Sequence, residues 1–375
     1  FDFVFIDEIY KIDNDFLNLD VYDEPQDIKD KDRDLAFRIA LELSVNRAKD
    51  MLLAGPFLDF SSSATMKNFI EDNNFIVLDY NAYDLVKRNQ ILYKELKNTT
   101  FDGIEFDNIF SKNNTEKLYS ILSKVPNEQS IVYCSTKYLA EDYALKLSER
   151  KIFNVEINDR YIKLLKHLEN EFGDNWCLVK ALKEGIGIHH GTIPKYIQKE
   201  IIKLYNEGII KCIFSTTTIT EGVNTTAKNM IILSNKKGQE NLKKFDILNI
   251  MGRAGRFRKH FSGRIFIIES NTKKTLQSQE DVLSHRNYSI ETRKSEVDLE
   301  FTRDKYLSID DKINKKIISE KYDENNIPEV IRKSFLMISY EEKISLYKII
   351  SNIINDDEDF FNRIIKSFNS KHASL

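Results

Sequence analysis

Residues 131–147 have the sequence IVYCSTKYLAEDYALKL, an apolar run followed by apolar positions at helical spacing. The first four residues predict a buried strand, and Leu139 and Leu147 belong to the predicted inner face of a helix. Thr136 stands between the two segments, where it is expected to cap the helix. A strand that leads directly into a helix is the unit from which α/β folds are assembled.

The same unit recurs after this stretch. Further apolar runs lie at residues 212–214, 230–233 and 265–268, and a helix is expected from Pro194 to Gly208. Proline at the start and glycine at the end is the asymmetry typical of helices. Strands that alternate with helices predict a parallel sheet covered on both faces.

The beginning of the sequence predicts part of a second open α/β sheet. Residues 3–6 are apolar and predict a strand, and residues 35–48 have the periodicity of a helix. Short strands are expected at residues 52–54 and 75–78. We expect the earlier strands of this sheet to precede the sequence. Residues 80–128 are polar and rich in Asn and Lys, which favours a connector.

Composition limits the class of protein. Of 375 residues, 41% are hydrophobic and 31% charged, so the chain is globular and long enough for two or three domains. The net charge of -3 neither requires nor excludes a polyanionic partner. The three cysteines lack metal-ligand spacing, which favours buried thiols in a reducing, cytoplasmic protein. No run has the length of a membrane span, so no membrane partner is expected.

We predict three regions. Residues 1–97 are expected to hold the last part of a first α/β lobe, built on the open sheet at the beginning of the sequence, and the connector. Residues 98–270 are expected to form a complete second α/β lobe, built on the parallel sheet. Residues 271–375 are expected to be mainly helical.

Two carboxylates follow the first strand. Asp7 and Glu8 come directly after the apolar run, where open α/β sheets place their ligands. In phosphoryl-transfer enzymes such an Asp holds magnesium, and a neighbouring Glu can orient the attacking water. A helix cap or a solvated turn is the alternative.

Two arginines lie in the segment 249–256. Arg253 and Arg256 are three residues apart, which predicts that they share one face of a helix. Guanidinium groups so placed can stabilise charge on a γ-phosphate. The small residues between them permit close approach of another surface.

Hydroxyl side chains are concentrated in residues 215–224, after a strand. Thr216 and Thr217 belong to this loop and suit contacts to a phosphate backbone. A Ser/Thr-rich turn is the alternative. The segments 63–65 and 189–191 carry little information alone, and the adjacent histidines lack a third metal ligand at fitting spacing.

The order of these segments resembles the Ski-like branch of the superfamily-two helicases, related to the DEAD-box and DEAH-box families. The matching segments are Asp7-Glu8-Ile9-Tyr10 (motif II), Ser63-Ala64-Thr65 (motif III), residues 131–136 (motif IV), residues 187–191 with the helix after Pro194 (the segment before motif V), residues 215–224 (motif V) and Asn249–Arg256 (motif VI). The resemblance covers roughly residues 1–270. The sequence departs from the family pattern at Tyr10, where His is commoner, and at Asn249, where Gln is usual.

This resemblance implies two RecA-like parallel sheets, a partial first lobe and a complete second one, followed by a helical region for which a winged helix is one form. It also implies ATP and Mg²⁺ as cofactors and DNA or RNA, single-stranded or duplex, as partner, with a protein partner subunit as a further expectation. The roles it implies are magnesium binding by Asp7, water activation by Glu8, completion of the site by Arg253 and Arg256, nucleotide sensing by Glu221, Gly222 and Asn224, nucleic-acid binding by Thr136, His190, Thr216 and Thr217, and coupling by Ser63 and Thr65.

No G-x-x-x-x-G-K-[ST] loop occurs in the sequence. A helicase or translocase whose phosphate-binding loop precedes Phe1 is the favoured interpretation. A catalytically silent nucleic-acid-binding scaffold with a helicase-like fold is the alternative. Genome maintenance and antiviral defence are two of the pathways that the family serves.

Overall fold

The computed structural model describes residues 1–7, 9, 12, 32–55, 64–78, 86–107, 111–155, 157–220, 225, 227–255, 262–278, 290, 294–356 and 358–372. The chain divides into two compact units. The first unit contains residues 1–78 and 281–375, and the second contains residues 79–280.

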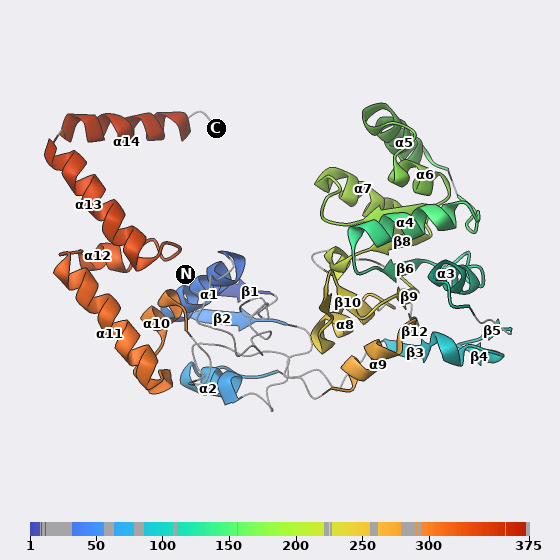
Figure 1. The fold of residues 1–375 in the computed structure, drawn as a ribbon, viewed down its shortest axis with the longest axis horizontal. Helices are drawn as coiled ribbons and strands as arrows, with labels where there is room; N and C mark the ends of the chain where they lie inside the picture. The colour runs from blue at the N-terminus through green and yellow to red at the C-terminus, as the bar shows by residue number, and fades with distance from the viewer. Residues whose placement is uncertain are drawn as a thin grey trace. The chain divides into compact units, whose positions relative to one another are not determined.

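A six-stranded sheet forms the centre of the second unit (Figure 1). Its strands, in spatial order, are β3 (Lys87–Leu92), β12 (Ser262–Ile267), β9 (Asn229–Ile232), β6 (Ser130–Tyr133), β8 (Cys212–Ser215) and β7 (Ile186–His189). All five neighbouring pairs are parallel. The predicted α/β fold with a parallel sheet is confirmed.

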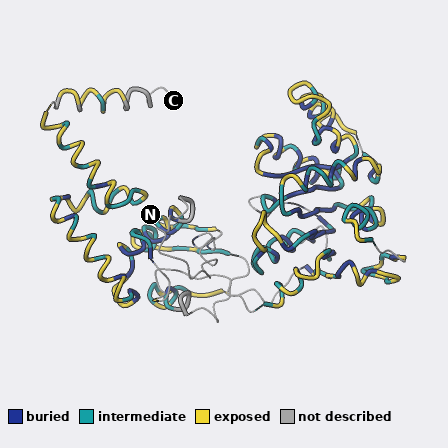
Figure 2. The backbone as a smooth tube through the Cα atoms, viewed as in Figure 1, coloured by how far each residue is buried: buried dark blue, intermediate teal, exposed yellow. Residues whose placement is uncertain are grey.

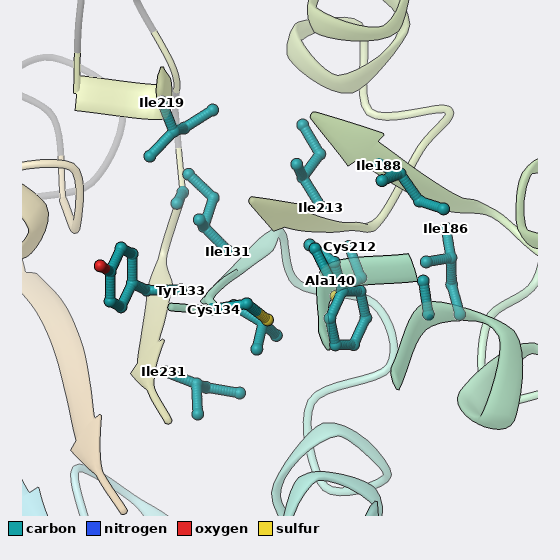
Figure 3. Close-up of a cluster of buried hydrophobic side chains, with 14 of the residues drawn as sticks. Ile131, Tyr133, Cys134, Ala140, Ile186, Ile188, Cys212, Ile213, Ile219 and Ile231 are labelled. Carbon is teal, nitrogen blue, oxygen red and sulfur yellow. The ribbon is translucent and has the colours of Figure 1, made fainter. Parts of the chain in front are cut away.

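Helices complete the second unit. They are α3 (Asn114–Leu122), α4 (Lys137–Ser148), α5 (Asp159–Phe172), α6 (Cys177–Lys183), α7 (Lys195–Asn206), α8 (Lys244–Met251) and α9 (Ser270–Leu276). Every residue of β6, β7, β8 and β9 is buried, which requires cover on both faces of the sheet. Figure 3 shows part of the resulting core, in which Ile131, Ile213 and Ile188 come from three different strands.

The predicted connector holds more structure than its polar sequence suggested. Besides α3 it contains β3, the edge of the main sheet, and a hairpin of β4 (Thr99–Phe101) and β5 (Ile104–Phe106). The expected boundary after residue 97 therefore falls inside the second unit. β3 has the sequence KRNQIL and pairs only with β12, and an edge strand of this kind does not require a continuous apolar run.

The first unit contains a two-stranded parallel sheet of β1 (Phe3–Ile6) and β2 (Asp50–Leu53). The helices α1 (Asp32–Arg47) and α2 (Ala64–Asp72) belong to the same unit. A small core of buried residues is formed by Ile9, Ile12, Leu41, Phe69 and Tyr306. The strand expected at residues 75–78 is wrong: this segment joins no ladder, and Ile76 is 88% exposed. Without a neighbouring strand, its backbone groups have no ladder to join.

The C-terminal part of the first unit is helical, as predicted. Its helices are α10 (Glu296–Phe301), α11 (Ile309–Glu324), α12 (Glu329–Arg332), α13 (Tyr340–Asp356) and α14 (Glu358–His372), with a short 3-10 helix η6 (Asp304–Tyr306). Residues 294–356 and 358–372 contain no strand, so the hairpin of a winged helix does not lie within them. Among the described helices, none is long and apolar enough to cross a membrane.

Polar contacts attach these helices to the first part of the unit. Arg38 of α1 donates from Nε to Asp298 of α10 over 2.8 Å, and both side chains are almost completely buried. Asp72 of α2 accepts from Lys305 Nζ at 2.7 Å and from the Tyr306 hydroxyl. These two donors lower the pKa of Asp72. Two segments more than two hundred residues apart in sequence thus form one unit.

Candidate functional site

Three neighbouring strands of the second unit end at the same edge of the sheet. The last residues of β6, β8 and β7 are in register with one another. Because parallel strands leave a sheet at one edge, the residues that follow them lie close together. Thr136 follows β6, Thr216 and Thr217 follow β8, and His190 follows β7. The structure therefore brings all four predicted nucleic-acid-binding residues to this edge.

Hydrogen bonds hold the hydroxyl loop against the end of β7. Ser215 Oγ donates to the carbonyl oxygen of His189 over 2.8 Å. Thr218 Oγ1 lies 3.1 Å from His189 Nδ1 and 3.3 Å from Thr216 Oγ1. The chain then continues as a 3-10 helix, η4 (Thr217–Thr220). A loop of short side chains is thereby fixed in place at the sheet edge.

His189 is neutral at pH 7. Burial, together with the nearby ammonium group of Lys195, lowers its pKa to about 4. The charged form is disfavoured because a buried imidazolium loses its hydration. His189 therefore acts as a hydrogen-bonding partner of Thr218 and adds no positive charge to the edge.

His190 is also buried, with 2% of its surface exposed. Its Nε2 lies 3.0 Å from Glu141 Oε1, and its Nδ1 lies 3.0 Å from Thr192 Oγ1. Burial lowers the pKa of His190 although Glu141 raises it. A neutral ring with its proton on Nε2 satisfies both contacts, since a carboxylate only accepts and a hydroxyl can donate to Nδ1. The side chain of His190 thus positions Glu141 and Thr192 and presents little surface of its own.

Two helices begin at the same edge. Thr136 caps α4 by accepting from the backbone N–H of Leu139 at 3.2 Å, as predicted, and its hydroxyl proton remains to be donated. α7 begins after Pro194 without a side-chain cap. The first residues of these helices are Lys137 and Lys195, both exposed, and they lower the pKa of His190 and of His189 respectively. Helix N-termini and ammonium groups together make the edge electropositive.

The arginine segment differs from its prediction. Helix α8 ends at Met251, so the expectation that Arg253 and Arg256 share a helix face is wrong. The chain turns away because Gly255 adopts a φ of +72° and packs on β12. A Cβ atom at Gly263 of β12 would lie 2.7 Å from the backbone of Ala254. The close approach predicted from the small residues is confirmed, and Arg253 is half-buried in this turn.

Several predicted site residues lie outside the described part of the chain. They are Glu8, Ser63, Glu221, Gly222, Asn224 and Arg256. Thr65 belongs to the backbone of α2, and its side chain is not among those described. The nucleotide-sensing and coupling roles stay predictions.

Asp7 is exposed and directly follows β1, as expected of the first carboxylate. It belongs to the first unit and Arg253 to the second, and a shared nucleotide site stays a prediction. Within the described residues, no group of three or more His, Cys, Asp or Glu side chains could hold a metal ion.

Sequence reasoning missed five residues at the sheet edge. Lys137 and Lys195 had a usable signal, because each is the first residue of a helix that starts at the edge. Thr192 and Thr218 could have been suspected from their place beside the histidines and in the hydroxyl loop. Glu141 had no signal, since it lies 49 residues before the histidine that it contacts.

Known proteins that resemble this chain include a helicase domain family and several individual relatives. Residues 113–258 match the helicase conserved C-terminal domain. The chain is 29% identical over 282 residues to Anti-bacteriophage protein B of Escherichia coli K12, covering 75% of this chain and 35% of that protein. It is 24% identical over 264 residues to human Helicase POLQ-like, covering 64% of this chain and 23% of the relative.

A third relative is the ATP-dependent DNA helicase Hel308 of Pyrococcus horikoshii. It is 28% identical over 160 residues, which cover 41% of this chain and 22% of that helicase. The chain thus spans about a third or less of the length of each of these relatives.

Proposed function

We propose that this chain, which belongs to the superfamily-two helicases, is part of a motor that couples ATP hydrolysis to movement along DNA or RNA, or to its unwinding. In this proposal the second unit contributes the nucleic-acid-binding edge of one lobe. The nucleotide would bind where the first lobe meets the second.

The convergence at one sheet edge of hydroxyl groups, two helix N-termini and two lysines carries this proposal. Hydroxyl and backbone N–H groups donate to phosphate oxygens and carry no sequence information, which suits a motor that moves past any sequence. The ammonium groups of Lys137 and Lys195 would neutralise backbone phosphates and make binding depend on salt. Buried His189 and His190 would hold the donors in place.

The ATP site in this proposal is assembled from both lobes. Asp7 fits a magnesium ligand because it is an exposed carboxylate at the end of β1, and magnesium prefers such oxygens. When bound, Mg²⁺ would neutralise charge on the phosphates. Glu8 would orient the attacking water, and Arg253 and Arg256 would stabilise the transferring phosphoryl group. Glu221, Gly222 and Asn224 would sense the nucleotide, while Ser63 and Thr65 would couple the two sites.

A role in antiviral defence is the pathway that we favour. It is supported by the similarity to Anti-bacteriophage protein B, which covers more of this chain than the other two relatives do. A cytoplasmic location and a protein partner subunit belong to the same proposal. Bacteria that carry the complete gene should resist phage infection, and Arg256→Ala should remove that resistance in a plaque assay.

Substitution of Arg256 tests the motor most simply. In the complete protein, Arg256→Ala should abolish the ATP hydrolysis that single-stranded DNA or RNA stimulates, because the γ-phosphate loses a guanidinium partner. Binding of the nucleic acid should remain measurable by fluorescence anisotropy. Arg256→Lys is the matched control, since it keeps the charge but not the planar fork, and it should restore little activity.

The outcomes separate the two functions that a helicase-like fold can have. Normal ATP turnover in Arg256→Ala would remove the assigned role of this arginine. Nucleic-acid binding by the complete protein without any ATP turnover would instead identify a catalytically silent scaffold.

A further inference from the structure

Helices α5 and α7 of the second unit are joined by side-chain contacts. His167 Nε2 of α5 lies 3.0 Å from the hydroxyl of Tyr196 on α7, and the two rings meet edge to face at 5.7 Å. Arg160 of α5 forms ion pairs with Glu200 and Glu207 near the other end of α7. The later part of α5 therefore lies beside the beginning of α7.

The aromatic ring of Tyr196 is held in position by His167 and is also accessible to a ligand. It is the second residue of α7, and 49% of it is exposed. The contact with His167 restricts the ring, so little conformational entropy remains to be lost when a ligand packs on it. Its neighbour Lys195 is the first residue of α7, and Gln198 of the same helix donates from Nε2 to the carbonyl oxygen of His190, which follows β7, over 2.9 Å. The ring thus stands next to the proposed phosphate-binding edge.

The surface around this ring is basic. Lys163, Lys166, Lys195 and Lys199 are all exposed, and none forms an ion pair with a residue that the structure describes. The nearby carboxylate of Glu200 is engaged by Lys203 at 2.5 Å and by Arg160. Figure 2 shows exposed residues along α5. Uncompensated ammonium groups beside an exposed aromatic ring suit a polyanion that carries flat bases.

We propose that Tyr196 is a stacking platform for an unpaired base of a nucleic-acid strand. The phosphates of the strand run from the sheet edge across the lysines of α5 and α7. This inference rests on the proposed function and deepens it, because it assigns single-stranded nucleic acid, with its bases exposed, as the ligand of this lobe. Stacking on a tyrosine tolerates every base, as a moving motor requires.

The test compares an intact oligothymidylate with a strand of the same length whose central nucleotides lack bases, both bound to the complete protein. Tyr196→Ala should weaken binding of the intact strand about fivefold to tenfold, the effect of losing one stacked base. Binding of the abasic strand should not change. Tyr196→Phe should retain binding of the intact strand, because it keeps the ring. Ile157→Ala removes another exposed apolar side chain before α5 and should have no effect.

Each contrary outcome has a separate meaning. Tyr196→Ala could weaken binding of the intact and abasic strands equally, or Tyr196→Phe could weaken binding as much as Tyr196→Ala does. Either result would show that Tyr196 acts through its contact with His167 and would overturn the inference. Unchanged binding in Tyr196→Ala would also overturn it and leave the proposed function standing. Failure of the unaltered protein to bind either strand, and also an oligouridylate of the same length, would remove the proposed function and this inference together.

Discussion

The six-stranded sheet of the second unit and the parallel pair of strands in the first unit use apolar strands in different ways. In β8 of the second unit every residue is buried, because β6 and β7 flank it and helices cover both faces. In β1 of the first unit the only strand partner among the described residues is β2, and Phe3 and Phe5 are 59% and 55% exposed. Both strands are largely apolar, and each is followed directly by a polar residue, Asp7 after β1 and Thr216 after β8.

The burial of a strand's side chains therefore depends on the neighbouring strands and helices, which the sequence of the strand alone does not determine. The second unit draws its stability from a large apolar core that extends through the sheet. The first unit has a small apolar cluster and is joined by buried polar contacts such as that of Arg38 with Asp298. The same kind of substitution should thus have different effects in the two units.

The largest expected effect is a phenylalanine truncation in the second sheet. Phe214→Ala in β8 should lower the free energy of unfolding by about 3–5 kcal/mol, because a fully buried ring leaves a cavity. Phe5→Ala in β1 is the matched change and, in a protein of residues 1–375, should cost less than about 1 kcal/mol because the ring is 55% exposed there. Urea unfolding, followed by hydrogen exchange in peptides from each sheet, measures both. Similar losses in the two strands would break the comparison.

The second prediction concerns the polar link within the first unit. Arg38→Met should lower the free energy of unfolding by about 3 kcal/mol, because the buried carboxylate of Asp298 loses the guanidinium that neutralises it. Lys49→Met removes the exposed ion pair with Asp2 and should cost less than about 1 kcal/mol. Protection of α10 in hydrogen exchange should fall only in the Arg38 variant. A neutral effect of Arg38→Met would mean that apolar packing alone joins the helices.

A smaller effect is expected from pH in the second unit. The folded-state pKa of His189 is lowered to about 4, whereas the unfolded chain binds a proton near pH 6.5. Between these values the unfolded state holds more protons, so stability is full above about pH 6.5 and falls as pH decreases. The loss from pH 7 to pH 5 should be about 2 kcal/mol. His189→Gln should remove this part of the pH dependence, and an unchanged profile would contradict burial of a neutral ring.

Most of the second lobe was predictable because its strands and helices carry local signals. The apolar run before Thr136 and the span from Pro194 to Gly208 defined their elements correctly. β3 escaped prediction because an edge strand can be polar. The strand expected at residues 75–78 failed because this segment pairs with no strand in the part of the chain that the structure describes. Pairing partners are a tertiary property that a single segment does not reveal.

The candidate site was predictable in its residue types and less so in its geometry. Thr136, His190 and Thr216 were named as binding residues from the resemblance, and the structure adds that they lie at one edge, since parallel strands end together. The helix expected through Arg253 was wrong because Gly255 has a positive φ where the chain packs on Gly263, eight residues later. The contact of His190 with Glu141 depends on the packing of α4 beside β7, which no spacing rule predicts.

The salt dependence of nucleic-acid binding tests the central claim most directly. The account predicts that the double variant Lys137→Gln/Lys195→Gln lowers the slope of log K against log salt by about 1.5, the release of counterions from two phosphates. Lys211→Gln changes a lysine that precedes β8 at the opposite edge of the same sheet and should leave the slope unaltered. A slope in the double variant equal to that of the unaltered protein would contradict the assignment of this edge as the phosphate-binding surface.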